Sequence, residues 1–470
     1  MNVSNLDLKK EEEEFKIEMQ RLILNDQTQI KLDLSRNRIG DEGMKALSEA
    51  LKVNQSLANL VLSKNKIGDE GMKALCEALK VNQTLTKLSL FGNGIGDEGM
   101  QALSEAFKVN QTLTNLDLSL NEIGDEGMKA LCEALKVNQS LICLGLYDNQ
   151  IGDEGMQALS EPLKANQTLT NLDLSLNEIG DEGMQALCEA LKVNQTLICL
   201  DLSDNQIGDK GMEPLCEALK VNQTLVYLDL SYDQIGDKVT EPLSEALKVN
   251  QTLINLDLSY NRIGDKGTKA LCEALKVNQT LISLGLCDNQ IGSKGVEYLS
   301  HALKVNQTLT QLDLSNYKIG NYDNKEDQKI ILEFIQSLKI NKSIINLKIE
   351  GNDLNKKDQN KIDNIIKRNV NFQKKLTKSV KVGNLQLFQQ LIQIEKIPLI
   401  YQMFDDDDEE IYIPNNQEQN TIFHTAIFHN QTEILFYLLF ANNEKTDQEI
   451  ISKRNFLLNF KNAKTKQKYN

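Results

Sequence analysis

The sequence has no tryptophan, few other aromatic residues and no long apolar run. Aromatic residues make up 5% of the 470 residues and hydrophobic residues 40%, so leucine and isoleucine must fill most of the core. No stretch approaches the roughly 18 consecutive apolar residues of a membrane helix. The start of the chain, MNVSNLDLKKEEEEFKIEMQ, also lacks the apolar segment of a signal peptide. We therefore expect a soluble, cytoplasmic protein that does not bind a membrane.

Residue types that build metal, nucleotide and catalytic sites are also scarce. The eight cysteines form no CxxC pair, the GxxxxGK[ST] phosphate loop is missing, and histidine occurs only at His301, His424 and His429. A zinc site or a nucleophile with its base needs several such groups close together. We therefore predict no catalytic residue, no metal site and no cofactor, and we expect reduced cysteines.

Negative charge is concentrated in the first two thirds of the chain. The net charge is -15, but residues 321–470 contain 22 basic and 20 acidic residues, so the preceding residues carry -17. An acidic body repels phosphate backbones. Nucleic acid is therefore not an expected partner.

A unit of 28 residues repeats through most of the chain. The asparagine that follows Leu-x-Leu-x-x recurs at intervals of 28 or twice 28, at Asn37, Asn65, Asn93, Asn121, Asn149, Asn177, Asn205, Asn261 and Asn289. Asp233 and Tyr317 hold this position in two further units, and Asn352 closes a twelfth unit seven residues late. Such a period predicts a repeat array rather than a single globular core.

Each unit is expected to contain one strand and one helix. In residues 112–139, Leu116 and Leu118 alternate with outward polar residues such as Asp117, as in a strand. Asp125 is a candidate N-cap of the helix that follows. The apolar residues of that helix share one face: Met128, Leu131 and Leu135. The side chain of the repeated asparagine is expected to bond backbone groups of the turn.

Several motifs lose their usual meaning because they follow the repeat. Ten Asn-Gln-Ser/Thr sequons run from Asn54 to Asn306, and we interpret their asparagines as helix-end and turn residues. The GxGxxG at residues 94–99 matches a dinucleotide fingerprint, but its second and third glycines recur in most units as turn residues. At a strand spacing of about 4.8 Å, Cys143 and Cys199 are expected ~10 Å apart, too far for a disulfide.

The unit resembles the leucine-rich repeat of the ribonuclease-inhibitor type and is similar to the repeat arrays of NOD-like receptors. The resemblance covers roughly residues 29–354, about 12 units, and rests on this pattern: Leu113-x-x-Leu116-x-Leu118-x-x-Asn121-x-Ile123-Gly124-Asp125-x-Gly127. It implies an α/β solenoid with parallel strands on the concave face, helices on the convex face, and protein binding on the concave face. Residues 1–28 are predicted to form an N-terminal cap, with a helix over residues 9–25.

A different pattern follows the array. Residues 355–375 are predicted to be a linker or helical end cap, and residues 376–470 are similar to ankyrin repeats, which implies a small, truncated all-α region. The similarity rests on two motifs and the paired apolar residues after each: Val382-Gly383-Asn384-Leu385 with Leu391-Ile392, and Thr421-Ile422-Phe423-His424-Thr425-Ala426 with Leu438-Leu439.

Departures from the unit predict local distortion. Pro214 and Pro242 predict helices that begin late, with proline in the first turn, and Pro162 predicts a kink. The loss of motif residues predicts the most distorted units: Asp233 and Val239 in unit eight, and the segment 316–324.

Acidic and tyrosine side chains at outward strand positions form the candidate binding surface. The carboxylates are Asp33, Asp117, Asp173, Asp201, Asp229, Asp257 and Asp313, and the tyrosines are Tyr147, Tyr227, Tyr232 and Tyr260. Carboxylates about 4.8 Å apart repel one another, so a basic ligand would stabilise them. Exposed tyrosines beside them are typical of a protein-binding centre, which we expect near units eight and nine. The alternative is that aspartate is simply common in this position, solvated and bonded locally.

These patterns predict a non-catalytic scaffold that binds a protein or basic peptide on its acidic concave face. The resemblance also implies an alternative, a regulator of another enzyme, either a ribonuclease-inhibitor-like inhibitor or a Ran GTPase-activating-like protein. Catalysis by the chain itself is the weakest hypothesis because no catalytic site assembles. The pattern does not predict the oligomeric state.

Overall fold

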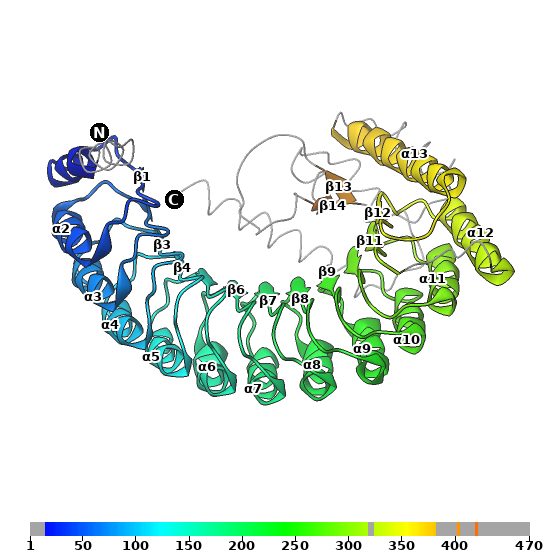
Figure 1. The fold of residues 1–470 in the computed structure, drawn as a ribbon, viewed down its shortest axis with the longest axis horizontal. Helices are drawn as coiled ribbons and strands as arrows, with labels where there is room; N and C mark the ends of the chain where they lie inside the picture. The colour runs from blue at the N-terminus through cyan, green and yellow to red at the C-terminus, as the bar shows by residue number, and fades with distance from the viewer. Residues whose placement is uncertain (1–14, 318–323, 382–401, 405–418, 422–470) are drawn as a thin grey trace, which may run out of the picture.

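The computed structural model describes residues 15–317, 324–381, 402–404 and 419–421. Its main body is a curved solenoid in which the strands line the inside of the arc and the helices the outside (Figure 1). Twelve parallel strands form one sheet in chain order. They are β1 (Lys31–Asp33), β2 (Asn59–Val61), β3 (Lys87–Ser89), β4 (Asn115–Asp117), β5 (Cys143–Gly145), β6 (Asn171–Asp173), β7 (Cys199–Asp201), β8 (Tyr227–Asp229), β9 (Asn255–Asp257), β10 (Ser283–Gly285), β11 (Gln311–Asp313) and β12 (Asn346–Lys348).

One helix follows each strand, so unit one comprises β1 and α2, and unit eight comprises β8 and α9. The helices are α2 (Gly40–Val53), α3 (Gly68–Leu79), α4 (Asp97–Phe107), α5 (Asp125–Leu135), α6 (Asp153–Ala165), α7 (Asp181–Leu191), α8 (Asp209–Val221), α9 (Thr240–Val249), α10 (Asp265–Leu275), α11 (Ser293–Val305), α12 (Lys325–Ile340) and α13 (Lys356–Lys381). A 3-10 turn, η1 (Asp237–Val239), precedes α9. Residues 15–23 form a helix before β1, within the range expected for the N-terminal cap.

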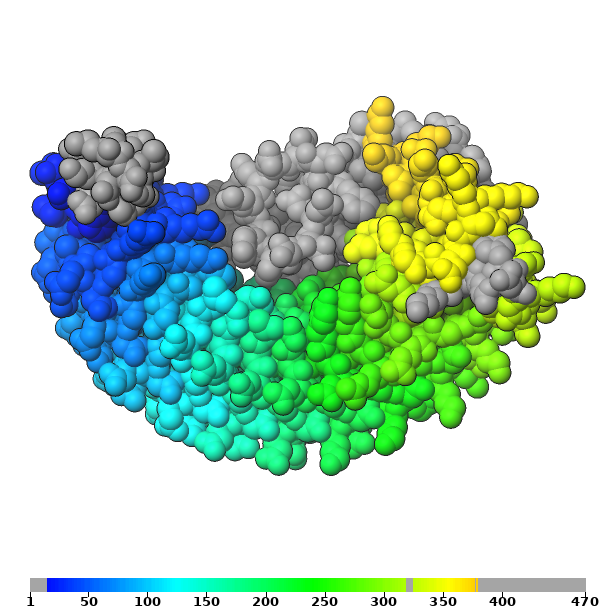
Figure 2. All heavy atoms as spheres, viewed as in Figure 1, coloured from blue at the N-terminus to red at the C-terminus, as the bar shows by residue number. Residues whose placement is uncertain are grey.

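The strands pair at equivalent positions of successive units, as the period predicts. Leu32 pairs with Leu60 and Leu88 with Leu116, and the central leucine of these strands is buried between the sheet and the helices. The buried core is mainly leucine, isoleucine, methionine and alanine. Side chains of successive units pack into one continuous body from the α2 end to α13 (Figure 2). The predicted leucine-rich solenoid with an aliphatic core is confirmed. None of the helices in the described residues has the length and apolar composition to cross a membrane.

The repeated asparagine joins its own unit to the preceding one, which confirms its predicted role in the turn. The Asn121 side-chain amide donates to the carbonyl oxygens of Leu118 (2.8 Å) and of Leu90 in the preceding unit (3.2 Å). Its Oδ1 accepts from the backbone N–H groups of Asn93 and Ile95, both at 3.0 Å. Buried backbone groups in the turns therefore have partners that no single unit could supply.

The predicted N-cap acts on a different helix from the one expected. Asp125 is the first residue of α5, and the Gly124 cap position before it carries no side-chain hydrogen bond. The Asp125 Oδ1 atom instead accepts from the backbone N–H groups of Gly152 (2.7 Å) and Gly155 (2.9 Å), at the start of α6. Each such aspartate therefore caps the helix of the next unit, satisfying donors that a helix N-terminus leaves unpaired.

The sequon asparagines are buried where the helices end. All ten are at most 6% exposed. Asn82, for example, donates from Nδ2 to the Leu51 carbonyl (2.8 Å) and accepts on Oδ1 from the Leu85 N–H (2.8 Å). These positions are structural, as interpreted from the repeat, and the fold leaves no room for a glycan on them. All eight cysteines, each within the described part of the chain, are free thiols.

The prolines behave differently in three helices. The prediction for Pro242 is confirmed because α9 begins at Thr240, two residues before it. The prediction for Pro214 is wrong, since α8 begins at Asp209 and contains Pro214 in its interior. α6 likewise continues without interruption through Pro162.

The capping aspartates explain why α8 begins early and α9 begins late. Asp181 accepts from the N–H groups of Gly208 and Gly211 and so holds the first turn of α8. A Cβ atom at Gly211 would lie 2.9 Å from Asp181 Oδ1, which is too close. Val239 occupies the equivalent position in unit eight, and the chain there forms η1 instead of a helical turn. This distortion of unit eight was predicted.

The chain beyond the array is described only in part. α13 continues past residue 375, so the boundary predicted there falls inside a helix. β13 (Gln402–Phe404) and β14 (Gln419–Thr421) form a short antiparallel pair in the region expected to be all-helical. The ankyrin-like motifs at residues 382–385 and 422–426 lie outside the described residues, as does most of the segment 316–324. The ankyrin-like prediction therefore stays a prediction.

Candidate interaction surface on the concave face

Four aspartates lie side by side at the centre of the concave sheet. Asp173 pairs with Asp201, Asp201 with Asp229, and Asp229 with Asp257, across the adjacent strands β6 to β9. All four side chains are half-buried. We call these four residues the aspartate row. The 28-residue period places each carboxylate at the same strand position, and the sheet brings them to neighbouring positions on one surface.

One oxygen of each carboxylate in the aspartate row is used locally. Asp201 Oδ1 accepts from the backbone N–H of Ser203 (3.0 Å) and from its hydroxyl (2.7 Å). The backbone N–H groups of Ser175, Ser231 and Ser259 bond the other three aspartates in the same way. This is the local bonding that the structural interpretation of the row expects. It uses Oδ1 and leaves Oδ2 of Asp201 for a ligand.

Asp173, Asp201 and Asp257 of the aspartate row hold protons more tightly than free carboxylates do. Burial, together with the adjacent Asp229 carboxylate, raises the pKa of Asp201 to about 7. Burial also raises the pKa of Asp173 and that of Asp257, where Asp229 is again the neighbouring charge. Loss of solvent and like charge both disfavour ionisation. A cation placed against the row would reverse this effect.

The predicted tyrosines lie in three different environments. Tyr227 on β8 donates a hydrogen bond from its hydroxyl to Asp229 Oδ2 (3.0 Å), and burial raises the pKa of that hydroxyl. Tyr232 and Tyr260 stack at the sheet edge, with ring centroids 3.9 Å apart and planes 8° apart. Tyr232 is 51% exposed and Tyr260 36% exposed. Tyr147 follows β5 and is separated from this group by two strands.

Three of the predicted carboxylates stand apart from the aspartate row, and Asp33 lies on β1, far from β6 in the strand order. Gly145 on β5 separates Asp117 from Asp173, and Asp117 accepts a hydrogen bond from the Ser89 hydroxyl (2.8 Å). Gly285 on β10 separates Asp313 from Asp257. Asp313 instead forms an ion pair with Lys348 (3.2 Å). Both interruptions can be recognised from the sequence, because a glycine replaces the aspartate of the strand.

A shallow groove of about 910 Å³ runs along the concave face from β1 to β8. Its lining includes Lys31 and Lys87 toward the N-terminal end, and Asp173, Asp201 and Asp229 toward the other end. The groove is therefore basic at one end and acidic at the other. The two lysines were not predicted from the sequence as part of the binding surface, although both occupy the first position of a strand.

Comparisons with known proteins agree with this architecture. The sequence profile of the NLRC3 LRR domain family matches residues 13–325, and the chain belongs to this family of leucine-rich repeat proteins. A comparison with curated protein sequences finds no match. Membership of this family supports a role as a protein-interaction scaffold and suggests an interaction domain rather than an enzyme.

Solved structures similar to the chain include three proteins with leucine-rich repeat architecture or related folds. The second actin-binding site of leiomodin-1 is 26% identical over 33% of this chain and 81% of that chain, with a TM-score of 0.27. An internalin, InlF, from Listeria monocytogenes is 18% identical over 63% and 89%, with a TM-score of 0.37. The mouse RP105/MD-1 complex is 19% identical over 65% and 49%, with a TM-score of 0.43. No functional conclusion follows from these low scores.

Proposed function

We propose that the protein is a non-catalytic scaffold that binds a basic segment of another protein on the aspartate row. The observation that carries the proposal is the alignment of four half-buried carboxylates on adjacent strands. Repulsion and lost hydration make this arrangement unfavourable in the free protein, so a cationic ligand gains binding energy from relieving it. The stacked Tyr232 and Tyr260 offer an aromatic face beside the carboxylates, where an arginine or lysine side chain can bind.

The spacing of the aspartate row favours an extended basic segment lying across the strands. Adjacent strands are about 4.8 Å apart, so the row spans about 14 Å. In an extended peptide, alternate side chains on one face are about 6.7 Å apart, so three of them span about 13 Å. A segment of the form Arg-x-Arg-x-Arg therefore matches the row in length and charge. The lysines at the other end of the groove favour an acidic continuation of the same partner.

Binding of an Arg-x-Arg-x-Arg peptide to the full chain tests this proposal. We expect the double variant D201N/D229N to lower the affinity at least tenfold, and Tyr260→Ala to lower it less. The matched control D33N/D117N removes the same charge from concave positions outside the row and is expected to change the affinity little. Equal losses in both double variants would mean that net charge, and not the row, determines binding.

Salt and pH distinguish the row from a nonspecific acidic surface. Affinity is expected to fall as ionic strength rises, because part of the attraction is screened. Asp201, with a pKa of about 7, is largely neutral at pH 6 and largely ionised at pH 8. Affinity for the peptide should therefore rise between pH 6 and pH 8, and this rise should be smaller in D201N.

The proposal places the protein in the cytoplasm. Eight free cysteines and ten buried sequon asparagines support a reducing compartment without glycosylation. Capture of partners from the native cell with wild type and D201N/D229N in parallel identifies proteins that depend on the row.

The acidic row also suits regulation of a basic enzyme, the alternative that the resemblance implies. Addition of the pure protein to a ribonuclease, and separately to a Ran GTPase, tests this hypothesis. A change in either rate that D201N/D229N abolishes would favour the regulator. Unchanged rates in both assays would favour the non-catalytic scaffold over the regulator.

A further inference from the structure

The tenth unit breaks a charge pattern that the first nine units share on the convex side. In α2 to α10, a glutamate in the second half of the helix forms an ion pair with the lysine three residues later, as Glu273 does with Lys276 (2.6 Å). In α11 this glutamate is replaced by His301. Lys304, the lysine of the pattern, therefore has no partner at that position and instead pairs with Glu333 of α12 (2.7 Å).

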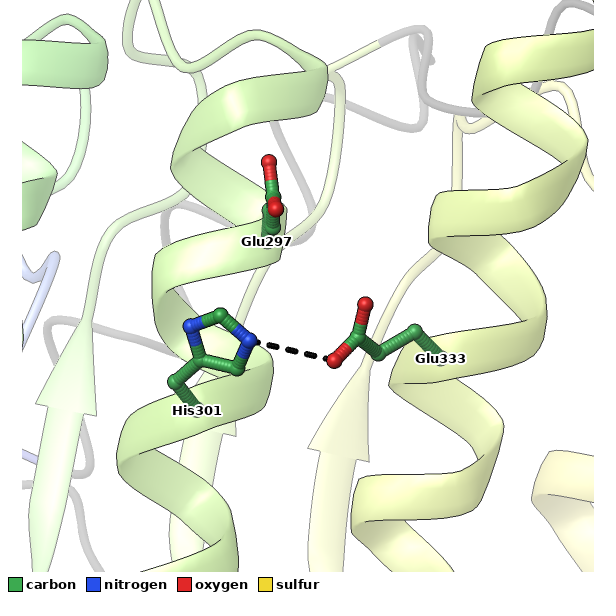
Figure 3. A group of neighbouring side chains, drawn as sticks. All are labelled: Glu297, His301 and Glu333. Atoms are coloured by element: carbon green, nitrogen blue, oxygen red, sulfur yellow. Dashed lines mark hydrogen bonds and ion pairs between the residues drawn. The ribbon is translucent and has the colours of Figure 1, made fainter.

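The substitution brings three metal-ligating groups together across two helices. Glu297 and His301 are one turn apart on α11, and Glu333 reaches toward them from α12 (Figure 3). One ligand atom from each residue lies within 4.8 Å of the other two, and His301 Nε2 is 3.1 Å from Glu333 Oε1. Ligands about 2.1 Å from a tetrahedral zinc ion are about 3.4 Å from one another. Small side-chain rotations are enough to reach that geometry.

We propose that Glu297, His301 and Glu333 form a binding site for a divalent transition-metal ion of the zinc type. One imidazole and two carboxylates suit such an ion, whereas Mg²⁺ and Ca²⁺ prefer more oxygen ligands. Glu297 makes no hydrogen bond or ion pair with the described residues, so its carboxylate is free to bind. Three protein ligands leave a fourth position for water at the exposed surface.

Lys304 makes the site weaker than its ligands alone would allow. Its ammonium group bonds the same Glu333 oxygen that lies against His301. A metal ion must displace this lysine or share the carboxylate with it. Replacing Lys304 should therefore strengthen metal binding. No such gain is expected if the histidine–glutamate pair has only a structural role.

A bound ion would join α11 to α12. α12 is the first helix after the segment in which the 28-residue spacing is lost. It already contacts α11 through the Ser293–Asp327 hydrogen bond and the Lys304–Glu333 ion pair. An ion that binds only the folded arrangement stabilises it.

Isothermal titration of the reduced full chain with Zn²⁺ tests the proposal. The measurements use a C143S background, because Cys143 is only partly buried, whereas the other seven cysteines are buried. We expect one saturable site that does not bind Mg²⁺, an affinity at least tenfold lower in H301Q and in E333Q, and a higher affinity in K304Q. The control H424Q/H429Q removes the other two histidines of the chain and should bind as the parent does.

Hydrogen exchange gives a second, independent readout. Zn²⁺ should slow exchange of the α12 amides in the parent and not in H301Q, and circular dichroism should show that H301Q is folded. The proposal is overturned if no saturable binding occurs, if H301Q binds as tightly as the parent, or if binding disappears only in H424Q/H429Q.

Discussion

Units four and eight of the solenoid carry different side chains at the same buried turn position, Asn121 in unit four and Asp233 in unit eight. In unit four, Asn121 donates hydrogen bonds to three backbone carbonyls and accepts two from backbone N–H groups. In unit eight, Asp233 accepts from Ile207 N–H (3.0 Å), but its Oδ2 is buried and has no hydrogen-bond partner among the described residues. The change from an amide to a carboxylate thus removes the side-chain N–H donor that a regular unit uses at this turn.

The comparison shows what the turn requires of its side chain. The buried backbone carbonyls need a donor, which an amide always supplies and a carboxyl group supplies only when it is protonated. Burial raises the pKa of Asp233 to about 8, so at neutral pH this carboxyl is largely protonated. Protonation removes the cost of a buried charge at this turn, and this makes unit eight sensitive to pH where unit four is not.

The largest effect is expected from Asp233→Asn, measured as a function of pH. The folded pKa of about 8 lies above the unfolded value of about 3.9. The stabilising contribution of this group is thus fully present below about pH 4 and is lost as pH rises to 8, by at most about 1.4 kcal/mol per pH unit. Urea unfolding at pH 5 and pH 8 should show that D233N gains stability relative to wild type as pH rises.

The reverse substitution, Asn121→Asp, is the control for this prediction. It should introduce the same loss of stability with rising pH into a regular unit. Identical pH slopes for wild type and D233N would show that Asp233 titrates in the folded chain as it does in the unfolded one.

A smaller effect is expected from truncating the two side chains. Asn121→Ala leaves the backbone N–H groups of Asn93 and Ile95 without their side-chain acceptor and removes the amide donor of the turn, at a cost of about 3 kcal/mol in the free energy of unfolding. Asp233→Ala removes fewer bonds, chiefly the one from the Ile207 N–H, and should cost about 1 kcal/mol at pH 6. Urea unfolding of the two variants measures the difference, and equal losses would contradict the contrast between the units.

The smallest effect is expected at the helix caps. Asp97 accepts from the N–H groups of both Gly124 and Gly127, whereas Asp209 accepts only from Gly236 among the described residues, because Val239 replaces the second glycine. Asp97→Ala should cost about 1 kcal/mol and Asp209→Ala about half of that. Thermal unfolding of the two variants side by side measures the difference. A larger loss in D209A would mean that η1 depends on its aspartate more than a regular helix does.

The repeat made most of the fold predictable, and it also concealed one feature. The leucine alternation and the turn asparagines are short-range patterns, so they could be predicted from one unit. The helix that Asp125 caps could not be predicted from one unit. Its own helix and the helix 28 residues later begin with the same residue types, so the sequence does not distinguish the two bonds. The difference between α8 and α9 was present in the sequence, at Gly211 and Val239, but depends on a contact with the preceding unit.

The candidate surfaces were predictable to different degrees. The aspartate row follows from the period, since equal spacing along the chain becomes adjacency in the sheet. The stacking of Tyr232 on Tyr260 does not, because both residues have a positive φ (60° and 55°) that redirects their side chains. The approach of Glu333 to His301 was missed because the irregular spacing after residue 317 removes the register that relates α12 to α11.

The cap from each aspartate to the next helix gives the array a direction. Each internal unit from α3 to α10 supplies an acceptor to the unit after it and receives one from the unit before it. The series ends in α11, where Ser293 replaces the aspartate, and α12 is capped by its own Asn324 (2.9 Å). A whole internal unit can therefore be inserted or removed between α3 and α8 without leaving an unpaired cap, whereas a cut within a unit leaves one on each side. Such interchangeable units allow the length of the concave surface to change while every junction stays the same.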